Sequence, residues 1–201
     1  MRDGVSVAAA SKLVVRPASP ERWPDVETIF AARGCSQARQ CWCMAYRRTG
    51  AAAPLRRGVR RADANRAELE ALVAAGETPG LLAYRGNTPV GWISLGPREL
   101  YARLERSPVM KRVDDAPVWS IVCFVVPAEH RRRGVARALL DGAIAYARRH
   151  GATLLEAYPM DRGPSADETM WFGTKSMFDD AGFEEVARRK PQRPIVRLSL
   201  R

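Results

Sequence analysis

The chain has 201 residues, of which 46% are hydrophobic and 27% charged, a composition typical of one soluble globular domain. No apolar run approaches the roughly 18 residues that a membrane-spanning helix needs, and the N-terminus lacks the pattern of a secretion signal. We therefore expect no membrane partner. Four cysteines are too few for a disulfide scaffold, so we expect a cytoplasmic protein. The net charge of +11 favours an acidic partner, although the excess of arginine over lysine is also typical of a GC-rich, bacterial genome.

Hydrophobic periodicity predicts strands and helices in alternation, and no internal repeat. We expect residues 1–11 to be disordered and residues 12–201 to form a single domain. Residues 35–62 and 97–117 have no regular period and are predicted to be irregular. The predicted elements are strands at 13–16, 81–84, 90–95, 118–126, 153–158, 184–189 and 195–200, and helices starting at Pro20, at 63–75, after Gly134 and at 173–181.

The most informative segment is the turn Arg131-Arg132-Arg133-Gly134-Val135-Ala136, which lies between a buried apolar strand and an amphipathic helix. A turn at a helix N-terminus gathers unpaired backbone N–H groups, and the helix dipole adds partial positive charge there. Gly134 lets an anion approach the backbone closely, and the arginines add charge. This pattern favours binding of a phosphate or pyrophosphate.

The spacing Arg-x-x-Gly-x-Ala in this context resembles the acyl-CoA loop of the GNAT superfamily of N-acetyltransferases. Ala181-Gly182-Phe183 and the order of the elements are also similar to that family. The resemblance implies an α/β fold with a twisted, mostly antiparallel mixed sheet of six to seven strands, the fourth and fifth splayed, and about four flanking helices. It implies acetyl-CoA as acyl donor, no metal, and CoA pyrophosphate bound by amides from Arg131 to Ala136. It also implies that Phe124, Val125 and Val126 hydrogen-bond the pantetheine arm.

The acid and base of an acyl transfer are harder to place. Many family members carry a tyrosine four residues before the Gly-Phe glycine, where this chain has Phe178. Either another group protonates the CoA sulfur or CoA leaves as thiolate. Tyr158, at the end of the fifth predicted strand, is the candidate acid, and Glu156, on the same face of that strand, is the candidate base. An edge aromatic and a solvated glutamate are the structural alternatives.

The Cys35…Cys41-Trp42-Cys43 cluster is the most distinctive remaining feature. A zinc site would need a second Cys-x-x-Cys or a histidine pair, which the sequence lacks, and a redox disulfide is a further alternative. In the GNAT fold, by resemblance, this segment lies over the acceptor channel. We therefore expect the aromatic and polarisable side chains here to shape the choice of acceptor. These are Trp42, Met44, Tyr46 and Arg47.

The sequence thus predicts an enzyme that transfers an acetyl group directly from acetyl-CoA to a primary amine in a ternary complex. A CoA-binding sensor without turnover is the alternative, motivated by Phe178. A nucleic-acid-binding protein is a third reading, based on charge alone, but the arginines are scattered over several predicted elements. Family resemblance also suggests a homodimer.

Overall fold

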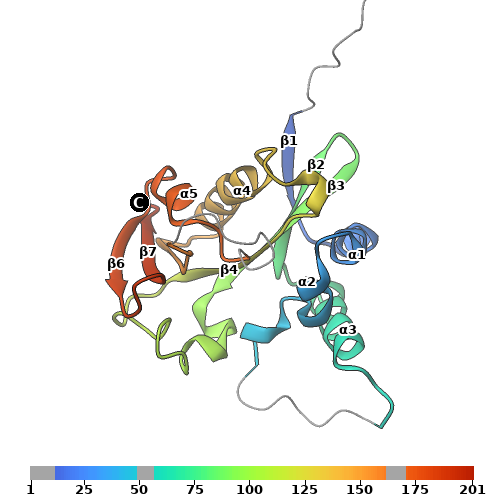
Figure 1. The fold of residues 1–201 in the computed structure, drawn as a ribbon, viewed down its shortest axis with the longest axis horizontal. Coiled ribbons are helices and arrows are strands. Elements are labelled where there is room, and N and C mark those ends of the chain that lie inside the picture. The colour runs from blue at the N-terminus through green and yellow to red at the C-terminus, as the bar shows by residue number, and fades with distance from the viewer. Residues whose placement is uncertain (1–11, 49–56, 162–170) are drawn as a thin grey trace, which may run out of the picture.

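The computed structural model describes residues 12–48, 57–161 and 171–201, so the expectation for residues 1–11 lies outside it. The described chain forms a seven-stranded sheet with the order β1-β2-β3-β4-β5-β7-β6 (Figure 1). This mixed, mostly antiparallel sheet confirms the predicted fold class. Its strands are β1 (Leu13–Pro17), β2 (Gly80–Arg85), β3 (Thr88–Pro97), β4 (Trp119–Val125), β5 (Leu154–Ala157), β6 (Glu184–Arg188) and β7 (Pro194–Ser199).

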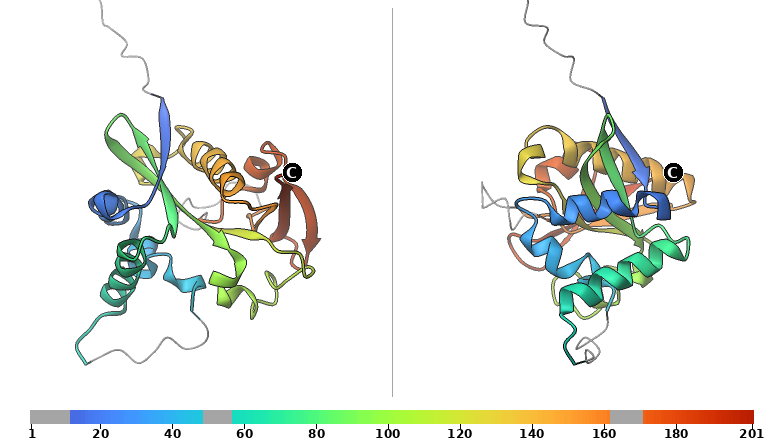
Figure 2. Two further views of the ribbon diagram at one scale, coloured as in Figure 1. Left: turned by 180° about the vertical axis from the view of Figure 1, so that it is seen from behind. Right: turned by 90° about the vertical axis from the view of Figure 1, so that its right-hand side faces the viewer.

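Helices cover both faces of the sheet. The helix α4 lies on one face beside α5, whereas α1 and α3 lie on the other (Figures 1 and 2). Short 3-10 turns fill several connections. The helices are α1 (Trp23–Ala31), α2 (Ser36–Cys41), α3 (Arg61–Ala74), α4 (Val135–Arg149) and α5 (Lys175–Asp179), and the 3-10 turns are η1 (Pro20–Arg22), η2 (Met44–Tyr46), η3 (Arg98–Leu100), η4 (Ala102–Leu104) and η5 (Ala128–His130).

The strands β4 and β5 pair in parallel for only three residues each. Trp119–Ile121 lies beside Leu155–Ala157, and β4 then continues to Val125 without β5 next to it. On its other edge β4 stays paired with β3, with a register shift after Ser94. The two central strands therefore diverge, which is the predicted splay, and one edge of β4 is left open to other partners.

Each face of the sheet carries its own hydrophobic core, as expected from the alternation of side chains along a strand. Val122 of β4 packs with the α1 and α3 side, whereas Ile121 packs with the α4 side. Two glycines bring α4 close to the sheet. A Cβ on Gly91 would lie 2.7 Å from Val135 Cγ1, and a Cβ on Gly142 would lie 2.6 Å from Val15 Cγ1. This close packing fixes the N-terminus of α4 above the end of β4.

The predicted elements agree with the structure to within a few residues, except in the segments expected to be irregular. Residues 35–62 contain α2 and η2, and residues 97–117 contain η3 and η4. The helix α2 has the sequence SQARQC and buries none of its residues, so it has no apolar period to detect. Among the described residues, no helix combines the length and apolar character needed to cross a membrane.

Candidate active site

A cleft of about 800 Å³ opens beside the unpaired half of β4. One wall consists of β4 from Cys123 to Val125 and the turn that leads into α4. The opposite wall consists of the segment from Gly34 to Tyr46, which follows α1. Trp171, Gly173, Thr174 and Met177, at and before α5, close the cleft, together with Arg103 of η4. The cleft therefore connects the splay of the sheet with the N-terminus of α4.

The turn before α4 has the geometry of an anion site. Gly134 has φ 77° and ψ 1°, a left-handed conformation that glycine adopts without strain, and no atom lies within 4 Å of the position of a Cβ. The helix begins at Val135, whose side chain is buried, while Val135 and Ala136 both line the cleft. The first amides of α4 lack acceptors within the helix, so they are available to a phosphate there.

The three arginines of this turn have different environments. Arg131 donates from Nε to the Val126 carbonyl at 3.1 Å and from Nη2 to the Gly34 carbonyl at 2.6 Å, so it ties the turn to both walls of the cleft. Arg132 is exposed, lines the cleft and has a left-handed φ of 55°. Arg133 does not line the cleft, and its carbonyl accepts a hydrogen bond from Arg85. Arg132 is thus the guanidinium of the turn best placed to meet an anion.

The predicted pantetheine edge of β4 lies on the cleft. Phe124, Val125 and Val126 all line it. The N–H of Phe124, however, already donates a 2.6 Å hydrogen bond to the Trp171 carbonyl. The segment at Trp171 therefore occupies part of the edge that β5 leaves open, and a ligand that uses the Phe124 amide has to displace it.

Of the four residues predicted to form the acceptor wall, one lines the cleft. Tyr46 lines the cleft, and its ring lies 5.7 Å from that of Phe172. Trp42 is buried and stacks on Phe30 at 4.7 Å, and Met44 is also buried. Arg47 lies over the ring of Tyr101, 5.1 Å from its centre. Trp42, Met44 and Arg47 thus support the wall from behind.

All four cysteines of the chain line the cleft, and all are free thiols. Burial raises the pKa of Cys35 and raises that of Cys41 to about 12. A hydrogen bond with Cys43 and then burial raise the pKa of Cys123 well above its usual value. Because the thiolate is the nucleophile, a protonated Cys123 does not favour a covalent acyl-cysteine route. The described residues bring together no cluster of histidine, cysteine or carboxylate side chains that could hold a metal ion.

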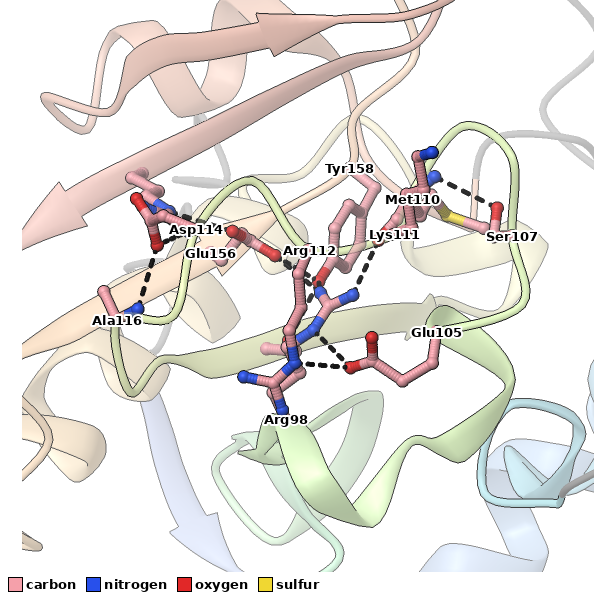
Figure 3. A network of polar contacts seen from close by, with 12 residues as sticks. Arg98, Glu105, Ser107, Met110, Lys111, Arg112, Asp114, Ala116, Glu156 and Tyr158 are labelled. Carbon is pink, nitrogen blue, oxygen red and sulfur yellow. Dashed lines mark hydrogen bonds and ion pairs between the residues drawn. The ribbon is translucent and has the colours of Figure 1, made fainter.

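The predicted base, Glu156, lies in a buried network beside the splay rather than on the cleft (Figure 3). One carboxylate oxygen accepts from Arg98 Nη1 at 2.7 Å, and the other accepts from Arg197 Nε at 2.8 Å. Arg98, which is 1% exposed, also pairs with Glu105 and donates to the Met110 carbonyl. Two guanidinium groups thus hold the Glu156 carboxylate inside the protein.

The predicted acid, Tyr158, belongs to the same network (Figure 3). Its hydroxyl donates to Glu156 Oε1 at 2.7 Å, lies 2.9 Å from Ser120 Oγ and accepts from Arg98 Nη1 at 2.5 Å. Burial and the neighbouring Glu156 charge raise the pKa of Tyr158 well above its usual value. Tyr158 and Glu156 are therefore brought together, as the sequence indicated, but neither lines the cleft that holds the turn and β4.

Phe178, in place of the family's tyrosine, is fully buried and packs edge-on against Phe124 and Phe183. Several cleft residues were absent from the sequence expectations, Arg103 and Gly34 among them. Arg103 lies in a segment with charges of both signs and no period, so no local signal separates it from its neighbours. The backbone contact of Trp171 with β4 has no sequence signal.

A sheet splayed beside a helix N-terminus, with a partly open strand edge between them, is an arrangement that suits a phosphate-bearing ligand with an extended arm. Residues 39–165, more than half of the chain, match the family model described as "Acetyltransferase (GNAT) family". The chain belongs to the GNAT acetyltransferase family. A search of curated proteins finds no matching relative.

Solved structures share the fold at low sequence identity. An N-acetyltransferase from Staphylococcus aureus Mu50 matches with a TM-score of 0.53 and 17% identity, covering 95% of this chain and 100% of its own. YncA, described as an acetyltransferase from Salmonella typhimurium with its cofactor acetyl-CoA, has a TM-score of 0.52 and 19% identity, covering 94% of each chain. PaiA N-acetyltransferase from Thermoplasma acidophilum, in complex with coenzyme A, has a TM-score of 0.52 and 13% identity, covering 94% of this chain and 99% of its own.

Proposed function

We propose that this protein is an N-acetyltransferase that moves the acetyl group of acetyl-CoA directly to a primary amine in a ternary complex. The observation that carries the proposal is the single cleft that joins the open edge of β4 to the Gly134 turn. Two structural neighbours were solved with acetyl-CoA or coenzyme A, which supports the same donor here. The protein would then work as an enzyme with two substrates and no metal.

The donor would be held mainly by backbone groups. Amides of the turn from Arg131 to Ala136 would bind the pyrophosphate, with Arg132 adding charge from the cleft side. The pantetheine arm would follow β4 past Val126 toward Cys123, and the thioester would lie where β4 and β5 diverge. A backbone N–H near Val125 would polarise the thioester oxygen, as an oxyanion hole does.

The transfer would proceed by attack of a neutral amine on the thioester carbonyl. The C–N bond forms, the C–S bond breaks, and the amine loses its proton to solvent. No carboxylate is among the described residues that line the cleft. Because positive charge disfavours a second cation, the cleft arginines would lower the pKa of a bound ammonium group and supply the neutral form. Phe178 cannot protonate sulfur, so CoA would leave as thiolate, which an ordinary thiol pKa near 8.5 permits.

Glu156 and Tyr158, the predicted base and acid, act as positioning residues in this proposal, because neither lines the cleft. Through Tyr158, their network joins Ser120 of β4 to Glu156 of β5, the middle of the three residue pairs between these strands. A rigid link there would set the width of the splay and hence the place of the thioester. A proton-transfer role would require a water or a movement that connects the network to the cleft.

The test is thiol release from acetyl-CoA in the presence of pooled amines, with isothermal titration of CoA alongside. Gly134→Glu should abolish CoA binding, because it adds bulk and negative charge at the pyrophosphate site. Gly151→Glu is the matched control. Gly151 also has φ 77° and open space around its Cβ position, but it lies at the other end of α4. Backbone strain and charge are therefore the same, and only the place differs. Loss of binding in both variants, or in neither, would contradict the proposal.

A CoA-binding sensor without turnover is the second candidate, favoured by the buried Phe178 at the position of the family's tyrosine. It predicts that the wild-type protein binds CoA and that Gly134→Glu does not, with no thiol released from acetyl-CoA by any amine. Amine-dependent release would exclude it.

A further inference from the structure

The charged side chains among the described lining residues of the cleft are positive rather than of both signs. Among the described residues, its lining contains arginines but no aspartate or glutamate. Arg131 is tied to two backbone carbonyls, and Arg137 pairs with Asp141 at 3.0 Å. Arg132 belongs to the turn that would meet the CoA phosphates. Arg103 also lines the cleft, but it lies outside the donor site and forms no ion pair with another described residue.

Arg103 reaches the cleft from the end opposite to the phosphate turn. It belongs to η4, which follows β3, and β3 runs antiparallel to β4. Pro97, at the end of β3, lies opposite Trp119, the first residue of β4, whereas the phosphate turn follows the last. A donor that lies along β4 with its pyrophosphate on the turn would therefore point its thioester toward the side where Arg103 lies.

The environment of Arg103 leaves its charge available. The side chain is exposed, and its guanidinium carbon lies 5.9 Å from the centre of the Tyr46 ring. Two other arginines of the same connection, Arg98 and Arg112, both pair with Glu105. Within the described part of the chain, Arg103 has no carboxylate within ion-pair distance. A guanidinium in a cleft without a counter-charge favours an anionic ligand group.

The surroundings of Tyr46 support the same conclusion. Its pKa is raised by burial, against the opposing influence of Arg193 first and then Arg103. Arg193 stacks on Phe172, 3.9 Å from the ring centre, and Phe172 in turn contacts Tyr46. Both guanidinium groups thus act on Tyr46 in the direction that favours negative charge. The remaining lining here is aromatic or apolar, with Trp171, Ala45 and Cys123.

We propose that the acceptor is an amine that also carries a carboxylate, with the carboxylate bound by Arg103 and an apolar body packed against Tyr46 and Trp171. The inference rests on the proposed acetyl transfer and names its substrate class. The planar guanidinium fork matches a carboxylate with two parallel hydrogen bonds. The same positive charge repels polycationic acceptors and favours the neutral, reactive form of the amine.

The test compares acceptors that differ only in the carboxylate. The protein amino acids and their carboxamides form matched pools, and a polyamine pool represents polycations. Thiol release from acetyl-CoA gives kcat/KM, and isothermal titration of each pool onto the CoA-bound protein gives binding without turnover. We expect the free acids to exceed the amides at least tenfold in both readouts, a difference typical of one charge-assisted contact. Polyamines should give no detectable signal.

Arg103→Gln should remove this preference, lowering kcat/KM for the acids at least tenfold and leaving the amides nearly unchanged. Arg103→Lys should restore part of the loss through its charge. Arg106→Gln is the matched control, because Arg106 is exposed on the same connection but does not line the cleft. Equal use of acids and amides, a preference for polyamines, or binding of neither pool to CoA-bound protein would overturn the inference. Failure of CoA itself to bind would instead overturn the proposed function.

Discussion

Arg98 and Glu156 form an ion pair in the interior of the protein, with 2.7 Å between Nη1 and Oε1 and neither side chain more than 1% exposed. The second oxygen of Glu156 pairs with Arg197, which also binds Asp114. The buried Glu156 carboxylate therefore contacts two guanidinium groups next to the parallel pairing of β4 and β5, and each of these also pairs with a more exposed carboxylate, Glu105 or Asp114. Charges inside a protein are tolerated when they are paired, and removing one partner leaves the other without compensation.

Glu156→Gln should accordingly destabilise the protein. The substitution keeps the shape but removes the charge that compensates Arg98 and Arg197, and loss of one partner of a buried pair costs about 3–5 kcal/mol. The free energy of unfolding, measured in urea, should fall by that amount. Glu105→Gln is the control. Glu105 also pairs with Arg98, but its side chain is 41% exposed, so its loss should cost about 1 kcal/mol or less.

The same variant tests the predicted base. If Glu156 takes the proton of the amine, Glu156→Gln should lose kcat even where the variant is folded. If Glu156 only positions the strands, its loss should appear in stability and in KM. A variant with unchanged stability and a hundredfold lower kcat would contradict the structural role.

Tyr158→Phe distinguishes a structural role of the Tyr158 hydroxyl from a role as the general acid. The hydroxyl contacts Ser120, Glu156 and Arg98, so its removal leaves buried polar groups with fewer partners. We expect a loss of about 1–3 kcal/mol in the free energy of unfolding, with kcat changed less than tenfold. Thermal unfolding and steady-state kinetics on the same preparation check both values. A folded variant with kcat reduced more than a hundredfold would instead support Tyr158 as the acid.

The phosphate turn could be predicted because its signal is local. The sequence shows a glycine between a buried strand and an amphipathic helix. In the structure this glycine, Gly134, has a positive φ. The strands and the helix α4 were predictable for the same reason, since their apolar runs and the amphipathic period of α4 are local to each element. The helix α2 was missed because it buries no residue and so has no period.

The polar network and the acceptor wall could not be predicted in this way, because they depend on contacts between distant segments. Glu156 and Tyr158 were identified as neighbours on one face of a strand, but Arg98, 58 residues before Glu156, has no signal that would assign it as their partner. Trp42 and Met44 look like pocket residues in the sequence, yet they pack behind the wall. The sequence indicates residue type and spacing, whereas burial and side-chain direction come from packing.

Trp171 should report the arrival of the donor. Its carbonyl accepts the Phe124 N–H on the edge of β4 where pantetheine is expected, and its side chain lines the cleft. The other four tryptophans of the chain do not line the cleft. Acetyl-CoA should therefore produce a saturable change in tryptophan emission, because the Trp171 segment must shift to release the Phe124 amide. Trp171→Phe should bind acetyl-CoA without this change, and Trp119→Phe, away from the cleft, should keep it.

Emission that responds equally in wild type and Trp171→Phe would contradict this placement of the donor. Amide hydrogen exchange gives an independent measurement. If pantetheine replaces the Trp171 carbonyl as acceptor, the Phe124 amide should remain protected in the complex, whereas exchange within residues 171–174 should increase.

The cleft thiols should make the protein less stable at alkaline pH. The pKa values of Cys35, Cys41 and Cys123 are raised in the folded state, Cys41 to about 12, whereas an unfolded cysteine titrates near 8.5. Above about pH 8.5 the unfolded chain loses protons that the folded chain retains, so the free energy of unfolding falls as the pH rises. Below the unfolded pKa both states are protonated, and these thiols contribute no slope.

Urea unfolding between pH 7.5 and 9.5 measures this slope. Cys41→Ala removes one raised thiol and should flatten the decline by up to about 1.4 kcal/mol per pH unit, the value for one proton. Ser36→Ala is the matched control, since Ser36 also lines the cleft but has no group that titrates in this range. Unfolded tyrosines titrate near pH 10 and contribute equally to wild type and Cys41→Ala, so the difference between the two slopes still reports Cys41. An equal slope in wild type and Cys41→Ala would mean that Cys41 ionises as readily in the folded cleft as in the unfolded chain.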